Sequence, residues 1–386
     1  GPALLGLWQR LGPGGSEAIA PARLAVVGEQ DLSWEEARDR GPLDSLGPYL
    51  GLVGCRPTSA ESLSVSWLEG LARCPWQTFL TRVLRLEPPL DPEAEVGELH
   101  AGLLGTALHR ALALLLGAEE GKAGGSSVPP PTEGQLGAAA LEAAAAVARE
   151  EGLTREAATL AVPRLAELLR VAHQLLWPTD EPVAVVGVER EGELDHSADG
   201  RELRVRFRAD LEEATPTGPR LTDFKTGRNP FDQANSSSVT RAYLKAVQRG
   251  EQLQAAVYAA ASGGVGRLLY LRPEEGGQGI REVAVGAAEC RQPLARVLAA
   301  LADLWATGTL FPRLESARDG QEPRACLWCP VREGCWRGDS GLRRRLALAA
   351  GELVARRRAG ALGDPVAMAL AGGWILPAGL SAMEDG

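Results

Sequence analysis

The sequence predicts an α/β fold in which helices flank a sheet, because helical and strand patterns follow one another in blocks. Apolar residues recur at helical spacing in two long segments, 135–151 and 154–176. Three stretches with strand character come next, at 184–194, 202–213 and 220–226. A helix over 239–262, strands over 267–271 and 280–285, and a helix over 294–307 complete the pattern. Helices, a strand block, a helix and more strands are typical of a sheet covered by helices.

The segments before this block predict further helices and one loop. From Ser64 onward apolar residues are spaced as in a helix, and Pro75 interrupts the run, so Cys74 is expected at the junction of two helical pieces. Residues 105–116 predict another helix, with His109 near its start. Residues 121–134 are rich in Gly, Ser and Pro and predict a mobile loop.

Composition limits the class of protein. A chain of 386 residues with 45% hydrophobic content is long enough for one large globular domain or two ordinary ones. It has neither an apolar run of about 20 residues nor an N-terminal signal pattern, so we expect a cytoplasmic protein. The net charge of −9 argues against a general nucleic-acid coat, so any basic groove must be local.

Changes in composition suggest boundaries along the chain. Residues 1–60 are Gly- and Pro-rich and are expected to be an N-terminal extension; the initial Gly1-Pro2 resembles a protease-cleavage scar. The chemistry falls within 61–342, where 116–180 is a helical segment. Residues 343–386 predict a basic helix followed by a flexible tail.

Two acids and a lysine form the first candidate site. On the strand that ends at Asp210, alternation places that carboxylate on one face with three arginines: Arg204, Arg206 and Arg208. On the next strand Asp223 and Lys225 share a face while Phe224 packs inward. If the strands pair, two carboxylates and an ammonium converge, a set suited to Mg²⁺ or Mn²⁺ and to attack on phosphate.

A surface strand with solvated charges is the alternative reading of a lone Asp-x-Lys. Three features instead favour the site of a metal-dependent nuclease: the second carboxylate, the same-face arginines and the following Gly227. Lysine is also rare here, occurring only at Lys122, Lys225 and Lys245. We expect the three arginines to be the first contact of an incoming DNA strand.

The cysteines form the second candidate site. Cys326, Cys329 and Cys335 follow a C-x2-C-x5-C pattern, and Cys74 lies far upstream before Pro75. In a cytoplasmic chain thiols are more often metal ligands or core residues than disulfides. The set suits an iron-sulfur cluster, with a zinc site as the alternative. Cys55 and Cys290 have no partner at ligand spacing and are expected in the core.

Three further residues are weak signals when taken alone. His109 fits an ordinary helix histidine, and Gln254 and Tyr258, one helical turn apart, fit an ordinary amphipathic pair.

In their order along the chain, these elements resemble the iron-sulfur nuclease domains of the RecB-like branch of the PD-(D/E)XK superfamily. They are most similar to the C-terminal nuclease domain of the AddB subunits of AddAB helicase-nucleases. The resemblance runs from about residue 64 to 336 and rests on the motifs already quoted, on Ser64-Val65-Ser66-Trp67-Leu68-Glu69 and on Gly308-Thr309-Leu310-Phe311-Pro312. Ala209 stands where the superfamily name would place proline.

The resemblance implies a PD-(D/E)XK core with a central mixed sheet and a role for each motif. His109, Asp210, Asp223 and Phe224 would bind the catalytic Mg²⁺ or Mn²⁺. Lys225 would assist the water, and the helix of Gln254 and Tyr258 would line the DNA side of the site. The four cysteines Cys74, Cys326, Cys329 and Cys335 would hold a 4Fe-4S cluster that staples the domain.

The function expected is therefore a DNA phosphodiesterase that cuts single-stranded DNA, as an exo- or endonuclease, in double-strand break repair or homologous recombination. The sequence has no phosphate-binding loop with a lysine, so a helicase, fused or bound as a partner, would have to supply the strand. Two alternatives stay open: a non-cutting DNA-binding module of a helicase-nuclease, and a CRISPR-adaptation nuclease, which is usually shorter.

Overall fold

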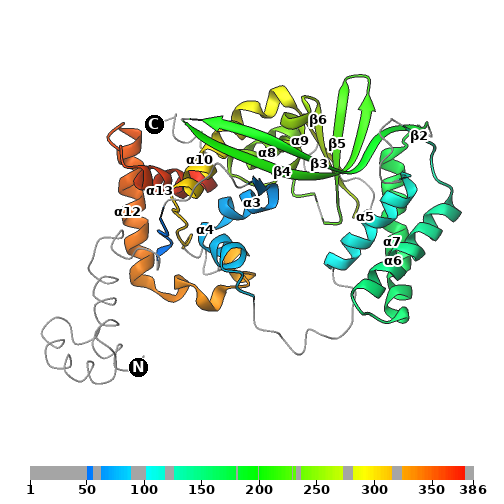
Figure 1. Cartoon of the computed structure of the whole chain (residues 1–386), viewed down its shortest axis with the longest axis horizontal. Coiled ribbons are helices and arrows are strands. Elements are labelled where there is room, and N and C mark those ends of the chain that lie inside the picture. Colours follow the sequence, from blue (N-terminus) through cyan, green and yellow to red (C-terminus); the bar gives the residue numbers. More distant parts are fainter. Residues whose placement is uncertain are drawn as a thin grey trace, which may run out of the picture. The chain divides into compact units, whose positions relative to one another are not determined.

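The computed structural model describes residues 50–54, 62–87, 101–117, 126–179, 181–198, 200–227, 229–231, 236–272, 281–314 and 324–378. Contacts divide the chain into two compact units, each built from separated stretches (Figure 1). Unit 1 comprises Gly1–Arg56, Cys74–Glu87 and Asp303–Trp374, and unit 2 comprises Pro57–Arg73, Pro88–Ala302 and Ile375–Gly386. Most of the expected N-terminal extension, and Cys55, lie outside the described residues.

Unit 2 is built on a 7-stranded mixed sheet, which confirms the predicted α/β class. The strands are β1 (Ser62–Ser64), β2 (Ser126–Val128), β3 (Val183–Ala198), β4 (Arg201–Thr215), β5 (Gly218–Lys225), β6 (Val265–Tyr270) and β7 (Glu282–Gly286). Strands β2 to β7 lie in chain order, and β1 pairs with β4. The β5–β6 and β1–β4 pairs are parallel, while β2–β3, β3–β4, β4–β5 and β6–β7 are antiparallel.

The three strands expected over 184–194, 202–213 and 220–226 are present as β3, β4 and β5 and form an antiparallel meander. Ala198 pairs with Arg201, so only two residues separate β3 from β4. Gly200 has φ +74°, the left-handed conformation that a two-residue hairpin turn requires. Strand β4 then pairs Leu211 with Thr222 on β5, so Asp210 and Asp223 are the next positions along these two strands.

Helices cover both faces of β5. In unit 2 they are α3 (Val65–Arg73), α5 (Ala101–Leu115), α6 (Glu133–Glu150), α7 (Arg155–Leu176), α8 (Ser236–Gln248), α9 (Gln254–Ser262) and most of α10 (Ala287–Ala306). Phe224 packs into the core made with α5, α6 and α7. Because alternate residues of a strand point to opposite faces, Asp223 faces the other way, toward α9.

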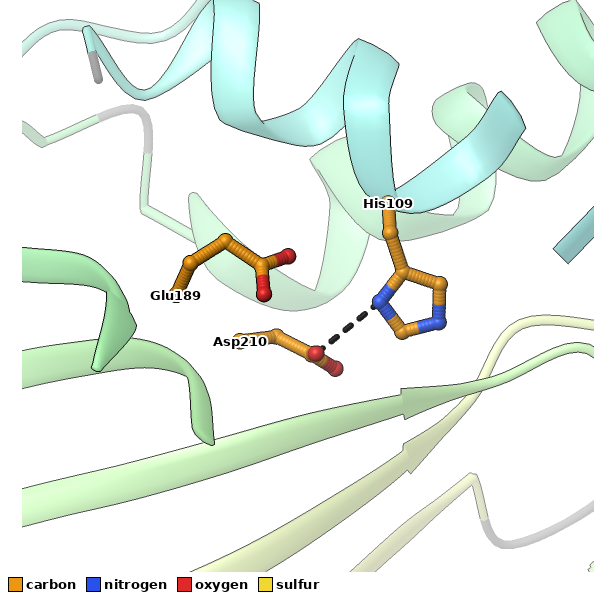
Figure 2. A group of neighbouring side chains, drawn as sticks. All are labelled: His109, Glu189 and Asp210. Carbon is orange, nitrogen blue, oxygen red and sulfur yellow. Dashed lines mark ion pairs between the residues drawn. The ribbon is translucent and has the colours of Figure 1, made fainter. Parts of the chain in front are cut away.

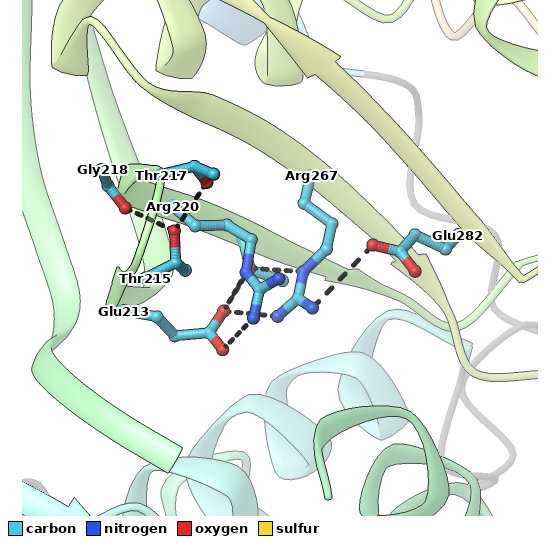
Figure 3. Close-up of polar contacts among 8 residues, drawn as sticks. Glu213, Thr215, Thr217, Gly218, Arg220, Arg267 and Glu282 are labelled. Carbon is cyan, nitrogen blue, oxygen red and sulfur yellow. Dashed lines mark hydrogen bonds and ion pairs between the residues drawn. The ribbon is translucent and has the colours of Figure 1, made fainter. Parts of the chain in front are cut away.

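A buried ionic network ties the middle strands together (Figure 3). Glu213 of β4 receives two hydrogen bonds from Arg220 of β5, at 3.1 and 2.8 Å, and a further one from Arg267 of β6. Arg267 also donates to Thr222 Oγ1 at 2.9 Å. Glu213, Thr222 and Arg267 are buried, so these contacts fix the lateral order β4–β5–β6 next to Asp223.

Unit 1 contains short helical elements and two longer helices. They are α4 (Pro75–Thr78), η2 (Phe79–Val83), α11 (Arg324–Leu327), η3 (Arg332–Gly334), η4 (Trp336–Gly338), α12 (Ser340–Arg358) and α13 (Pro365–Ile375). Helix α13 ends at the unit boundary, where η5 (Leu376–Ala378) of unit 2 follows. Cys74 lies between α3 and α4, at the junction the sequence predicts. Among the described residues, no helix is both long and apolar enough to cross a membrane.

Three expectations are corrected. The expected helix over 239–262 is two helices, α8 and α9, separated at Gly250, which has φ +76°. This left-handed conformation ends the helix, and a Cβ at this position would lie 2.3 Å from that of Ala72, so glycine is required here. The expected loop 121–134 contains strand β2 and the start of α6 at Glu133. The expected flexible tail contains α13, whose apolar residues are largely buried.

Candidate functional site

Asp210 is the centre of the polar cluster in unit 2. Its Oδ1 atom lies 2.9 Å from Nδ1 of His109, which α5 presents to the inner part of β4 (Figure 2). Its Oδ2 atom accepts a hydrogen bond from the backbone N–H of Phe224 at 2.6 Å. The carboxylate therefore joins a helix to two strands, and both of its oxygens are engaged.

Glu189 is a third member of this cluster that the sequence interpretation missed. Its neighbours Val188 and Arg190 pair with Leu211 and Ala209, so Glu189 lies opposite Asp210. It has φ +52°, which is unusual for a residue with a side chain. Ligand atoms of His109, Glu189 and Asp210 all lie within 4.8 Å of one another (Figure 2). A divalent cation could be held by such a set.

The charges in this cluster influence one another. Burial alone lowers the pKa of His109, but the contact with Asp210 and the nearby charges of Asp223 and Glu189 outweigh it and raise the pKa. Burial and Asp210 raise the pKa of Glu189, while Arg208 opposes this. The cluster therefore favours positive charge, from a proton or from a cation.

Asp223 and Lys225 form a second group next to the first. Lys225 Nζ lies 2.8 Å from Asp223 Oδ2. Oδ2 is buried, so the ammonium group meets a carboxylate that has little access to water. Burial, and secondly Asp210, raise the pKa of Asp223 to about 6, although Lys225 lowers it. The buried carboxylate favours positive charge beside it, which Lys225 supplies and which a divalent cation would increase.

Gln254 and Tyr258 reach Asp223 from the first two turns of α9. The Gln254 amide donates to Asp223 Oδ1 at 2.9 Å and accepts from Lys225 Nζ. The Tyr258 hydroxyl lies 2.8 Å from the carbonyl oxygen of Arg208 and 3.3 Å from Asp223 Oδ1. A phenol has one hydrogen, so the shorter contact takes most of it. Burial and Asp223 raise the pKa of Tyr258, which keeps the hydroxyl neutral.

The three arginines expected to contact DNA are exposed along β4. Arg204 lies 2.9 Å from Asp195, and Arg208 lies 2.8 Å from Glu189. Arg206 donates to the carbonyl oxygen of Ser62 at 3.2 Å. They form the row that alternation predicts, but acids pair with two of them and reduce the net positive charge of the row.

The four cysteines gather in unit 1. Cys74, Cys329 and Cys335, with Phe79, pack against a small core of Trp76, Leu80 and Val331. Burial, together with charge on the other three cysteines, Cys74 first, raises the pKa of Cys335 to about 11. The described cysteines are free thiols, and the lone Cys290 is buried as expected. Cys335 therefore lies near the other three thiols, although no three of the described cysteines bring their sulfur atoms within 4.8 Å of one another.

Comparison with known protein families matches residues 62–336 to the PD-(D/E)XK nuclease superfamily. This range contains every residue of the two clusters described above. No curated protein matches the chain significantly.

Proposed function

Since the chain belongs to the PD-(D/E)XK nuclease superfamily, we propose that it is a divalent-metal-dependent deoxyribonuclease acting on single-stranded DNA. One observation carries the proposal. Asp210 and Asp223 lie side by side on paired strands, with Lys225 on one carboxylate and His109 on the other. This set of donors, buried next to an ammonium group, is suited to hydrolysis of a phosphodiester.

The donors fit Mg²⁺ or Mn²⁺. Asp223 Oδ2 and Glu189 Oε2 are buried carboxylate oxygens, each 2.8 Å from a basic side chain, and carboxylate oxygens are the ligands that these ions prefer. His109, Asp210, Asp223 and Glu189 would hold the ion, and Phe224, whose side chain is in the core, could contribute only its carbonyl oxygen. When bound, the ion would supply positive charge that offsets the negative charge developing on the phosphate.

The remaining side chains orient the reacting groups. Lys225 is about one third exposed, at 29%, and its ammonium can donate to a water or to a phosphate oxygen while Asp223 holds it in place. Gln254 joins Asp223 to Lys225 through one amide group and so fixes the spacing of the two. The neutral Tyr258 hydroxyl supports Asp223 from the α9 side.

The choice of single-stranded DNA and of a partner rests on the resemblance to RecB-like nuclease domains. That resemblance supports a role in double-strand break repair or homologous recombination, with a helicase supplying the strand. It also supports a 4Fe-4S cluster held by the four cysteines, three of which pack against one small core in unit 1.

Cleavage of labelled single-stranded DNA tests the proposal. The protein should cut with Mg²⁺ or Mn²⁺ and should not cut with EDTA. Asp223→Ala and Lys225→Ala should each lower the rate by about a hundredfold or more, because a charge at the transition state is removed. Lys245→Ala, at an exposed position on α8, is the matched control and should cut normally. Cutting by Asp223→Ala at the wild-type rate would contradict the site assignment.

A further inference from the structure

Glu69 is a half-buried acid outside the donor set that contacts the start of helix α9. It belongs to the motif Ser64-Val65-Ser66-Trp67-Leu68-Glu69, to which the proposed function assigns no role. Its Oε1 atom accepts a hydrogen bond from the backbone N–H of Leu253 at 2.7 Å. Leu253 is the N-cap residue of α9 and has no side chain able to cap the helix. Glu69, from α3, therefore provides the cap that the local sequence lacks.

The start of α9 is under unusual constraint. The link from α8 contains Gly250 and Gln252, both at positive φ (+76° and +53°). The buried Tyr243 hydroxyl donates to the carbonyl oxygen of Gln252 and accepts from the N–H of Ala256, both at 2.8 Å. With Glu69, two side chains from other helices thus hold the first turn of α9 in place.

The next residue after Leu253 is Gln254, whose amide bridges Asp223 and Lys225. A shift of the first turn of α9 would move this amide relative to both partners. The charges of Lys225 and Asp223 also act on Glu69. Burial raises the pKa of Glu69 most, Lys225 lowers it and Asp223 raises it. Glu69 is therefore coupled to the site through the helix start and through space.

We propose that Glu69 is a positioning residue of the nuclease site, which fixes the start of α9 so that Gln254 holds Asp223 and Lys225 at their working separation. The proposal rests on the proposed function, because it concerns the geometry of that same site. The role of Glu69 is geometric, so an acceptor atom at the position of its Oε1 should be sufficient.

Three substitutions of Glu69 test this geometry. Glu69→Gln keeps an acceptor oxygen and should retain most of the wild-type kcat on single-stranded DNA. Glu69→Ala removes the acceptor and Glu69→Asp withdraws it by one methylene, so both should lower kcat by about tenfold to a hundredfold. KM should change little, because no contact with the strand is removed. If Glu69→Gln falls as far as Glu69→Ala, the charge and not the cap is responsible, and the proposal is wrong.

A double-mutant cycle separates positioning from general stability. If Glu69 acts through Gln254, Glu69→Ala should lower kcat less than about twofold when added to Gln254→Ala. Full additivity of the two losses would overturn the proposal. Thr154→Ala is the matched control, since Thr154 caps α7 through a 3.2 Å bond to the N–H of Ala157, and its loss should lower the melting temperature without changing kcat.

The readouts also distinguish this inference from the proposed function. Wild-type protein that never cuts would contradict the nuclease itself. Hydrogen exchange at the Leu253 amide then still tests the cap, which should exchange faster in Glu69→Ala and near the wild-type rate in Glu69→Gln. Wild-type protein that cuts, with Glu69→Ala and Glu69→Asp cutting equally well, would overturn only the positioning role.

Discussion

The Oδ2 atom of Asp210 accepts the backbone N–H of Phe224 at 2.6 Å, so the carboxylate of β4 holds β5 at the residue that separates Asp223 from Lys225. This bond sets the relative position of the two acids without using either oxygen of Asp223. It also directs the N–H of Phe224 toward β4 while the phenyl ring enters the core. One hydrogen bond thus links the packing of unit 2 to the geometry of its donors.

The raised pKa of Asp223 predicts a pH-dependent penalty on folding of the metal-free protein. The folded value is about 6 and the ordinary value is 3.8, so the folded state binds the proton more tightly. Stability from this group is present below pH 3.8 and is lost as the pH rises to about 6. Asp223→Asn, measured by urea unfolding in EDTA, should therefore stabilise the protein near pH 8, by at most about 3 kcal/mol, and much less near pH 4. The exposed Asp195→Asn should show no such difference.

Glu189 should contribute to metal affinity. Its Oε2 atom is buried, and its only described ionic partner at short range is Arg208, so replacing the carboxylate by an amide removes a charge from the donor set. Glu189→Gln should weaken Mn²⁺ binding by about tenfold or more, measured by calorimetry without DNA. Glu191→Gln, exposed on the same strand, is the control. Equal affinity in the two variants would exclude Glu189 from the site.

Glu189 was predictable in principle. Asp199-Gly200 is a turn dipeptide between the strands predicted over 184–194 and 202–213. A two-residue turn fixes the hairpin register, and counting back from it places Glu189 opposite Asp210. The step was missed because strand alternation was applied to β4 and β5 but not carried to β3. The acids and the lysine were found because their spacing along single strands is enough to place them on one face.

Other features could not be read from local patterns. The need for glycine at the break between α8 and α9 comes from the close approach of Gly250 to Ala72, which is distant in sequence. The contact of Glu69 with Leu253 is likewise long-range. Strand β1 is only Ser62–Ser64, and its parallel pairing with β4 leaves no periodic signal over such a length. These are contacts between segments, whereas propensity and periodicity report on one segment at a time.

The arginine row should contribute modestly to binding of single-stranded DNA. Acids already pair with Arg204 and Arg208, so the net charge offered to phosphate is small. Charge reversal at Arg206, which donates only to a backbone carbonyl, should weaken binding and reduce the salt slope by about one. Arg170→Glu, on α7 and paired with Glu133, is the control. Filter binding in Ca²⁺ or EDTA at several salt concentrations gives both slopes, and equal slopes would remove the row from the binding surface.

The Glu213 network should be important for stability. Glu213 and Arg267 are almost fully buried, so removing the carboxylate leaves a guanidinium without its main partner (Figure 3). Glu213→Ala should lower the free energy of unfolding by about 3–5 kcal/mol. Glu282 lies 3.9 Å from Arg267 and is 48% exposed, so Glu282→Ala should cost less than about 1 kcal/mol. Urea unfolding of the two variants compares a buried with an exposed partner of the same arginine.

Cys74 should be required for a metal centre in unit 1. It packs with Cys329 and Cys335 against one small core, although Cys74 is far from them in sequence. Burial raises the pKa of Cys329 and Cys335, so these thiols stay protonated when no metal is bound. The chain segments that carry them then lack the bonds from sulfur to metal that would hold them together. Protein prepared without oxygen should be brown, with near-stoichiometric iron and sulfide. Cys74→Ala should lose the colour and much of its stability, whereas Cys290→Ala, a buried cysteine outside the cluster, should keep the iron. Colourless wild-type protein with one tightly bound zinc would instead assign the four thiolates to zinc.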